Sequence, residues 1–127
     1  NRIPEIESAL TLLAKNGAEV LLPTQTTINF QERRRIVSVA AKQRIPVVGS
    51  RGEWTDDGAL MSYGASLADQ VRQSASIADK VLKGRKPAEI PIERPTRFEL
   101  AINLKTAKKI GLTIPPNVLA RADRVIR

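Results

Sequence analysis

The stretch that decides the fold is AEVLLPTQTTINFQERRRIVSVAAKQRIPVV, residues 18–48. Each of its ends, Ala18–Leu22 and Ile45–Val48, is a short apolar run of the kind that forms a buried strand in a parallel sheet. Pro23 ends the first run. Pro46 stands near the start of the second, where a missing backbone donor matters least. The two runs therefore predict two short buried strands.

The residues between these runs predict a helix. Asn29 precedes Glu32 by three residues, the spacing of a capping box, with Asn29 as the cap. We therefore expect a helix over residues 30–43. A strand, a helix and a strand joined by short loops predict a parallel strand pair with a right-handed crossover, and hence an α/β fold.

Apolar spacing and cap residues predict further elements on both sides of this unit. These are helices over residues 4–15, 67–82, 104–110 and 117–126, strands over 59–63 and 98–102, a loop over 49–58 and an extended segment over 88–97. Ser66 is the expected cap of the helix over 67–82, and Asn103 that of the helix over 104–110, which Gly111 ends.

The composition excludes several classes of protein. The chain has 127 residues, the size of one ordinary domain, with 42% hydrophobic and 27% charged residues. It has no cysteine and no histidine. Disulfides, thiolate and Ser-His-Asp catalysis and zinc sites built from these residues are therefore excluded, and we expect neither an enzyme nor a cofactor. Asp56 and Asp57 are expected to be turn residues, and no metal site is predicted.

The charge of the chain leaves a second class of function open. The formal net charge is +8, and a basic chain invites binding to nucleic acid. Aromatic residues are 3%, and they do not interleave with the basic residues as in binders of single strands. We expect no nucleic-acid partner, and a free-standing basic α/β domain that binds nucleic acid is the alternative. A steep loss of binding with salt would distinguish it.

Polar residues follow the ends of both predicted strands, where open α/β sheets bind their ligands. An arginine there binds carboxylates, and a tryptophan covers an apolar group. The candidate ligand-binding residues are Thr24, Gln25, Thr26, Ser50, Arg51, Trp54 and Tyr63, the last at the end of the expected strand over 59–63. The alternative is structural, because Thr and Ser before a helix are often caps and a lone Trp in a loop is often packed.

Several phrases occur together in a characteristic order. They are Ile45-Pro-Val-Val48, Gly58-Ala-Leu-Met-Ser-Tyr-Gly64, Leu82-Lys-Gly-Arg-Lys-Pro-Ala88, Phe98-Glu-Leu-Ala-Ile-Asn-Leu-Lys-Thr-Ala-Lys108 and Gly111-Leu-Thr-Ile-Pro-Pro116. Over nearly the whole chain, this order resembles the C-terminal part of ABC-transporter substrate-binding proteins, the family that includes tryptophan- and tyrosine-type binders.

The resemblance implies a three-layer, Rossmann-like parallel sheet from a two-lobed periplasmic binding protein. Residues 1–50 and 97–127 would belong to the second lobe, 59–85 to the first, and 51–58 and 86–96 to the segments that cross between them. The implied function is to bind a small molecule, such as an aromatic or other amino acid, in an interlobe cleft and to deliver it to an ABC permease. The implied location is periplasmic or extracytoplasmic.

The chain does not begin with Met, and we expect it to be either processed or a piece of a longer protein. The helix over 67–82 would then belong to a lobe that is mostly absent. Its apolar stripe consists of Leu67, Val71, Ala75, Ala78 and Leu82. An exposed stripe of this kind favours association, so we expect a homodimer through the helix over 67–82.

Overall fold

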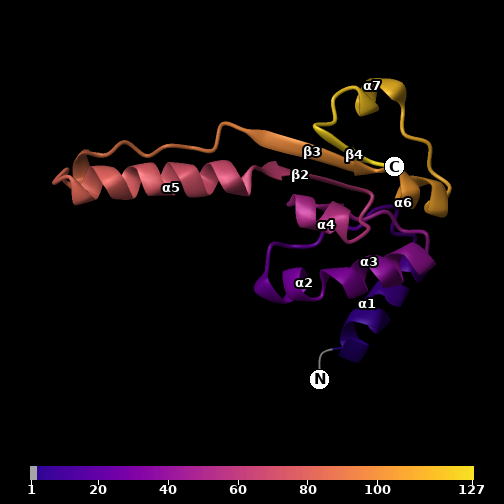
Figure 1. Cartoon of the computed structure of the whole chain (residues 1–127). Helices are drawn as coiled ribbons and strands as arrows, with labels where there is room; N and C mark the ends of the chain where they lie inside the picture. Colours follow the sequence, from indigo (N-terminus) through magenta and orange to yellow (C-terminus); the bar gives the residue numbers. More distant parts are fainter. Residues whose placement is uncertain (1–2) are drawn as a thin grey trace. The chain divides into compact units, whose positions relative to one another are not determined.

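The computed structural model describes residues 3–127 and is a mixed α/β structure (Figure 1). Its helices are α1 (Ile3–Lys15), α2 (Thr27–Gln31), α3 (Arg33–Lys42), α4 (Gly52–Asp56), α5 (Leu67–Leu82), the 3-10 turn η1 (Pro87–Glu89), α6 (Leu104–Ile110) and α7 (Pro116–Leu119). Its strands are β1 (Val48–Gly49), β2 (Met61–Ala65), β3 (Phe98–Asn103) and β4 (Arg124–Ile126). No helix within these residues has the length and apolar character needed to cross a membrane.

The four strands form one sheet in the order β1-β2-β3-β4. β1 and β2 pair in parallel, with Val48 opposite Met61, and β3 and β4 pair in parallel, with Ala101 opposite Arg124. The predicted α/β fold with a parallel sheet is therefore confirmed.

The predicted strand over residues 18–22 is reduced to one parallel bridge between Leu21 and Val47. Leu21 N donates to Pro46 O and Val48 N donates to Leu21 O, both at 2.9 Å. Extending this ladder in either direction would need the N–H of Pro46 or of Pro23, and proline has none. The two prolines therefore limit the pairing to a single bridge.

Two predicted helices differ from those observed. The helix expected over 30–43 is divided at Glu32 into α2 and α3, and its cap is Thr26 rather than Asn29. The helix expected over 117–126 is wrong: α7 ends at Leu119 and β4 follows. Asp123 explains the difference, because its N–H donates to Leu100 O at 2.9 Å and its carboxylate accepts from Leu100 N at 2.8 Å. These bonds join the end of the chain to β3.

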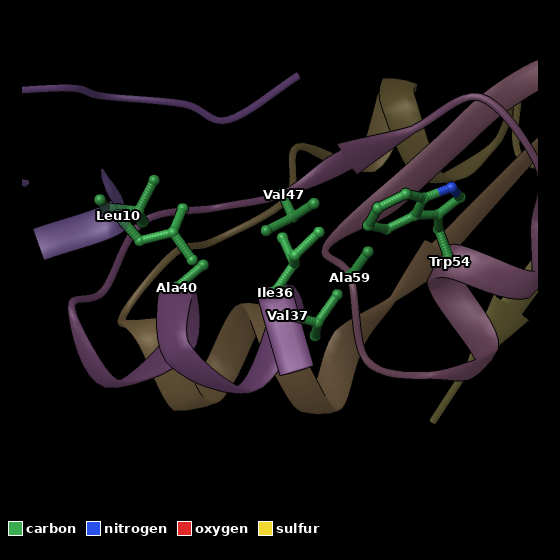
Figure 2. Packing of buried hydrophobic residues seen from close by; sticks show 8 residues of the cluster. Leu10, Ile36, Val37, Ala40, Val47, Trp54 and Ala59 are labelled. Atoms are coloured by element: carbon green, nitrogen blue, oxygen red, sulfur yellow. The ribbon is translucent and has the colours of Figure 1, made fainter. Parts of the chain in front are cut away.

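The described chain divides into two compact units, one of residues up to Gly64 with Glu99–Arg127, the other of Ala65–Phe98. The core of the first unit lies between α1, α3, α4 and β1, and Figure 2 shows the Trp54 indole ring in it beside Val47 and Ala59. The buried members of this cluster are Leu10, Ile36, Val37, Ala40, Ile45, Val47, Trp54 and Ala59. A smaller cluster joins Leu60 to Ala107 and Ile110 of α6.

The second unit consists of α5 and the segment that follows it. Ser66 caps α5 as predicted, accepting from Asp69 N at 3.4 Å. Glu93 ties the returning segment to the helix: Gln73 donates to it at 2.7 Å, and Lys80 lies 3.6 Å away. The hydrogen bond from Gln73, together with the charge of Lys80, lowers the pKa of Glu93 below its ordinary value. The predicted apolar stripe of α5 is exposed along its whole length.

Candidate ligand-binding site

A cavity of about 350 Å³ lies where the first predicted strand and β1 end, as the rule for open α/β sheets predicts. Its lining residues are Thr24, Gln25, Thr26, Thr27, Phe30, Ser50, Arg51 and Trp54. Six of the seven candidate residues are thus brought together. The seventh, Tyr63, lies on β2 with 59% of its surface exposed and does not line the cavity.

Thr27 and Phe30 line the cavity but were not among the candidates. The sequence placed Phe30 at the start of the helix expected over residues 30–43 and Thr27 in the polar loop before it. Because α2 begins at Thr27 rather than at Phe30, its first turn brings Phe30 back toward the polar loop. The signal in the sequence that could have shown this was Thr26, a good cap residue two positions before the apolar Ile28.

Arg51 is the cation of the site, and two groups hold it. Its guanidinium carbon lies 4.3 Å from the centre of the Phe30 ring, within cation–π range. Its Nη2 lies 3.0 Å from Glu53 Oε1, which leaves donors beyond that pair. The side chain is 37% exposed, so it reaches solvent. The stacking on Phe30 and the ion pair with Glu53 together hold the guanidinium at the cavity wall.

A second arginine completes the surroundings of Phe30. The Arg33 guanidinium carbon lies 4.4 Å from the same ring centre, and Arg33 Nη1 donates to Phe30 O at 2.8 Å. Arg33 Nε lies 2.6 Å from Asp57 Oδ2, and Arg34 Nε lies 2.8 Å from Asp57 Oδ1. Asp57 thus pairs with both arginines behind the ring, and of these three arginines it is Arg51 that lines the cavity.

Hydrogen bonds between the polar loop and the first turn of α2 fix the conformation of the loop. Thr26 Oγ1 accepts from Asn29 N at 3.2 Å and is the cap of α2. Asn29 Nδ2 donates to Thr24 O at 3.1 Å and to Thr24 Oγ1 at 3.0 Å. The structural reading of Thr26 as a cap is therefore correct, and its hydroxyl has this role besides lining the cavity.

Trp54 belongs both to the core and to the cavity wall. Residues 49–58 were expected to form a loop, but α4 forms there and carries Trp54, which is only 3% exposed. Gly49 makes room for it, because a Cβ on Gly49 would lie 2.3 Å from Trp54 Cβ. The indole is therefore a fixed part of the wall.

The polar groups of the described residues do not assemble a metal site. No group of three or more His, Cys, Asp or Glu side chains lies close enough to hold a metal ion within the part of the chain that the structure describes. The cavity contributes hydroxyls, an amide and a guanidinium, which are groups that bind polar organic molecules.

The family model described as "ABC transporter substrate binding protein" matches residues 1–126. The chain belongs to this family. No curated protein matches the chain at a significant level.

Solved structures share the fold of this chain. The chain is 27% identical to the ABC domain in complex with L-Trp from Streptococcus pneumonia, with a TM-score of 0.85 over 98% of this chain and 43% of that one. A conserved domain protein from Vibrio cholerae is 24% identical, with a TM-score of 0.87 over 97% of this chain and 41% of that one.

A third structure shares the fold at a greater distance. The ligand-free, open structure of a substrate-binding protein with adhesive properties from Clostridium difficile is 18% identical, with a TM-score of 0.72 over 98% of this chain and 41% of that one. The chain thus spans less than half the length of each of these proteins.

Proposed function

We propose that this chain is part of the solute-binding component of an ABC importer and that its cavity binds a small carboxylate, such as an amino acid. The observation that carries the proposal is Arg51, a guanidinium stacked on Phe30 at the wall of a cavity that threonine and serine hydroxyls also line. Arginine binds carboxylates strongly because its donors match the two carboxylate oxygens.

The other lining groups suit the rest of an amino acid. The hydroxyl and amide oxygens of Thr24, Gln25 and Ser50 accept hydrogen bonds from an ammonium group. Phe30 and Trp54 offer an apolar wall to a side chain. The L-Trp complex of the Streptococcus protein supports an aromatic amino acid as the first ligand to test.

The proposal includes binding without chemical change and a location outside the cytoplasm, where a permease receives the solute. The absence of His and Cys from the sequence supports a binding role over a catalytic one. The family supports the extracytoplasmic location and the permease partner. The assignment of residues 59–85 to a first lobe and of 1–50 and 97–127 to a second is part of the same proposal.

Calorimetric titration of the full-length protein with L-tryptophan, then with the other common amino acids, tests this function. We expect saturable binding of at least one of them, with an affinity that changes little with salt. A protein that binds none of them, or that instead binds nucleic acid with a steep salt dependence, would contradict the proposal.

Replacing Arg51 by methionine is expected to weaken binding of an amino acid about tenfold or more, because a hydrogen bond to a charged group contributes about 1.5–3 kcal/mol. Methionine keeps much of the apolar stem and removes the charge. Arg121→Met is the control, since Arg121 is exposed and far along the chain from the lining residues. Equal affinities of Arg51→Met and wild type by calorimetry would remove Arg51 from the site.

We also propose that the chain self-associates through α5. The support is the exposure of its apolar stripe, where Leu67 is 49%, Val71 59% and Leu82 87% exposed. At micromolar concentration, light scattering is expected to give a dimer mass for this chain and a monomer mass for Val71→Asp, with Ser76→Asp unchanged. A monomer mass for the unmodified chain would refute self-association.

A further inference from the structure

A buried polar network includes Thr55 of α4, the helix that also carries Trp54. Of the four buried polar residues found among those that the structure describes, three belong to this network: Thr55, Ser62 and Asn103. Thr55 Oγ1 donates to Ser62 Oγ at 2.7 Å, and Asn103 Nδ2 donates to Thr55 O at 3.1 Å. The network thus joins α4 to β2 and to the end of β3.

Asn103 is the centre of this network because its side-chain nitrogen, its side-chain oxygen and its backbone N–H all form hydrogen bonds. Its side-chain oxygen accepts from Thr106 N at 3.0 Å, and its backbone N–H donates to Leu60 O at 2.8 Å. With its oxygen held by Thr106, the side-chain NH₂ points at the carbonyl of Thr55. Asn103 is 6% exposed and Thr55 0%, so no solvent competes for this bond.

Three further contacts hold both ends of α4. Thr106 Oγ1 donates to Gly58 O at 2.9 Å, just beyond the C-terminal end. Arg124 forms an ion pair with Asp56, and its Nη2 lies 3.3 Å from Gly52 O at the N-terminal end. The hydrogen bond to Asp56 raises the pKa of Arg124 above its ordinary value. Asn103, Thr106 and Arg124 come from β3, α6 and β4, more than 40 residues along the chain from α4.

The position of α4 decides the shape of the cavity. Trp54 is in this helix, and Arg51 and Ser50 directly precede it. Trp54 fits against Gly49 so closely that a displaced helix would move both the indole and the backbone of Ser50 and Arg51. Five residues do not form a stable helix alone, so the tertiary contacts must hold α4.

Because these contacts are polar, we expect them to fix the position of α4 rather than to add to the stability of the fold. Apolar groups of the same shape often stabilise an interior as well as a hydrogen-bonded set does, whereas the bonds fix one arrangement. We propose that Asn103, with Thr55 and Ser62, is a positioning residue for ligand binding: it holds α4 where Trp54 and Arg51 form the cavity wall. This inference rests on the proposed function of the cavity.

Asn103→Ser in the full-length protein tests the inference, because serine keeps the helix cap and cannot reach Thr55 O. Amide hydrogen exchange is measured at residues 52–59, which comprise α4 and the turn after it, and in α3 as a reference. Calorimetry measures L-tryptophan binding in the same sample. Asn117→Ser, the same change at an exposed residue, is the matched control.

We expect exchange at 52–59 to become about tenfold faster with α3 unchanged, and L-tryptophan binding to weaken about five- to tenfold, the loss of roughly one buried hydrogen bond. Unchanged exchange at 52–59, equal acceleration in both helices, or unchanged affinity with a loosened α4 would each overturn the inference. If Asn103→Ser does not fold, Thr55→Val, which keeps the shape and removes the bond to Ser62, is judged by the same criteria.

The two measurements separate this inference from the proposed function. Failure of the wild-type protein to bind any amino acid counts against the proposed function. The exchange measurement needs no ligand, so it decides separately whether Asn103 holds α4 in place.

Discussion

Replacing Trp54 by alanine is expected to lower the free energy of unfolding by about 4 kcal/mol, because a large buried aromatic side chain leaves a cavity that the surrounding residues do not fill. Trp54 is 3% exposed and packs in the main core with Val47 and Ala59 (Figure 2). The change also removes part of the cavity wall. Urea denaturation followed by circular dichroism measures the loss of stability.

Two control variants separate the effect of burial from that of substitution itself. Trp54→Phe keeps an aromatic ring and is expected to lose clearly less stability. Leu22→Ala changes a side chain that is 67% exposed and is expected to change stability by less than about 0.5 kcal/mol. A Trp54→Ala protein as stable as Leu22→Ala would show that the indole is not part of the core.

The elements with strong local signals were predicted well. Ser66 caps α5, Asn103 caps α6, and Gly111 ends α6 in a left-handed conformation with φ +80°. Each of these signals acts within one helical turn. The sequence alone therefore suffices to place these helix ends.

Two elements that depend on distant partners, α4 and β4, were missed. α4 is held by Asn103 and Arg124, which are 48 and 72 residues from the groups they contact. β4 exists because it pairs with β3, and the local pattern of its residues also suited a helix. No periodicity within either segment reports these contacts.

The sequence also predicted most, but not all, of the residues that line the cavity. The rule that ligands bind where parallel strands end selected the candidates, and six of them line one cavity. Phe30 was missed because its place depends on where α2 begins and on stacking with Arg51. Tyr63 lies elsewhere because β2 continues to Ala65, so Tyr63 is within the strand and not after its end.

Gly64 of β2 lies close to the backbone of Ser50, just after β1. A Cβ built on Gly64 would lie 1.9 Å from Ser50 O and 2.9 Å from Ser50 C, which are backbone atoms of a residue that lines the cavity. Backbone atoms cannot turn aside as the end of a flexible side chain does. A side chain at residue 64 must therefore push the two segments apart.

Gly64→Ala is accordingly expected to lower the free energy of unfolding by about 3 kcal/mol, the upper part of the usual range for overpacking. It should also weaken amino-acid binding, because the displaced atoms belong to Ser50. Gly52→Ala is the matched control, since the nearest atom to its Cβ is the side-chain end Arg124 Nη2 at 3.0 Å rather than a backbone atom, and α4 accommodates alanine. Denaturation and calorimetry on both variants measure the two effects. A Gly64→Ala protein that matches Gly52→Ala in stability would mean that β2 and Ser50 are not in this close contact.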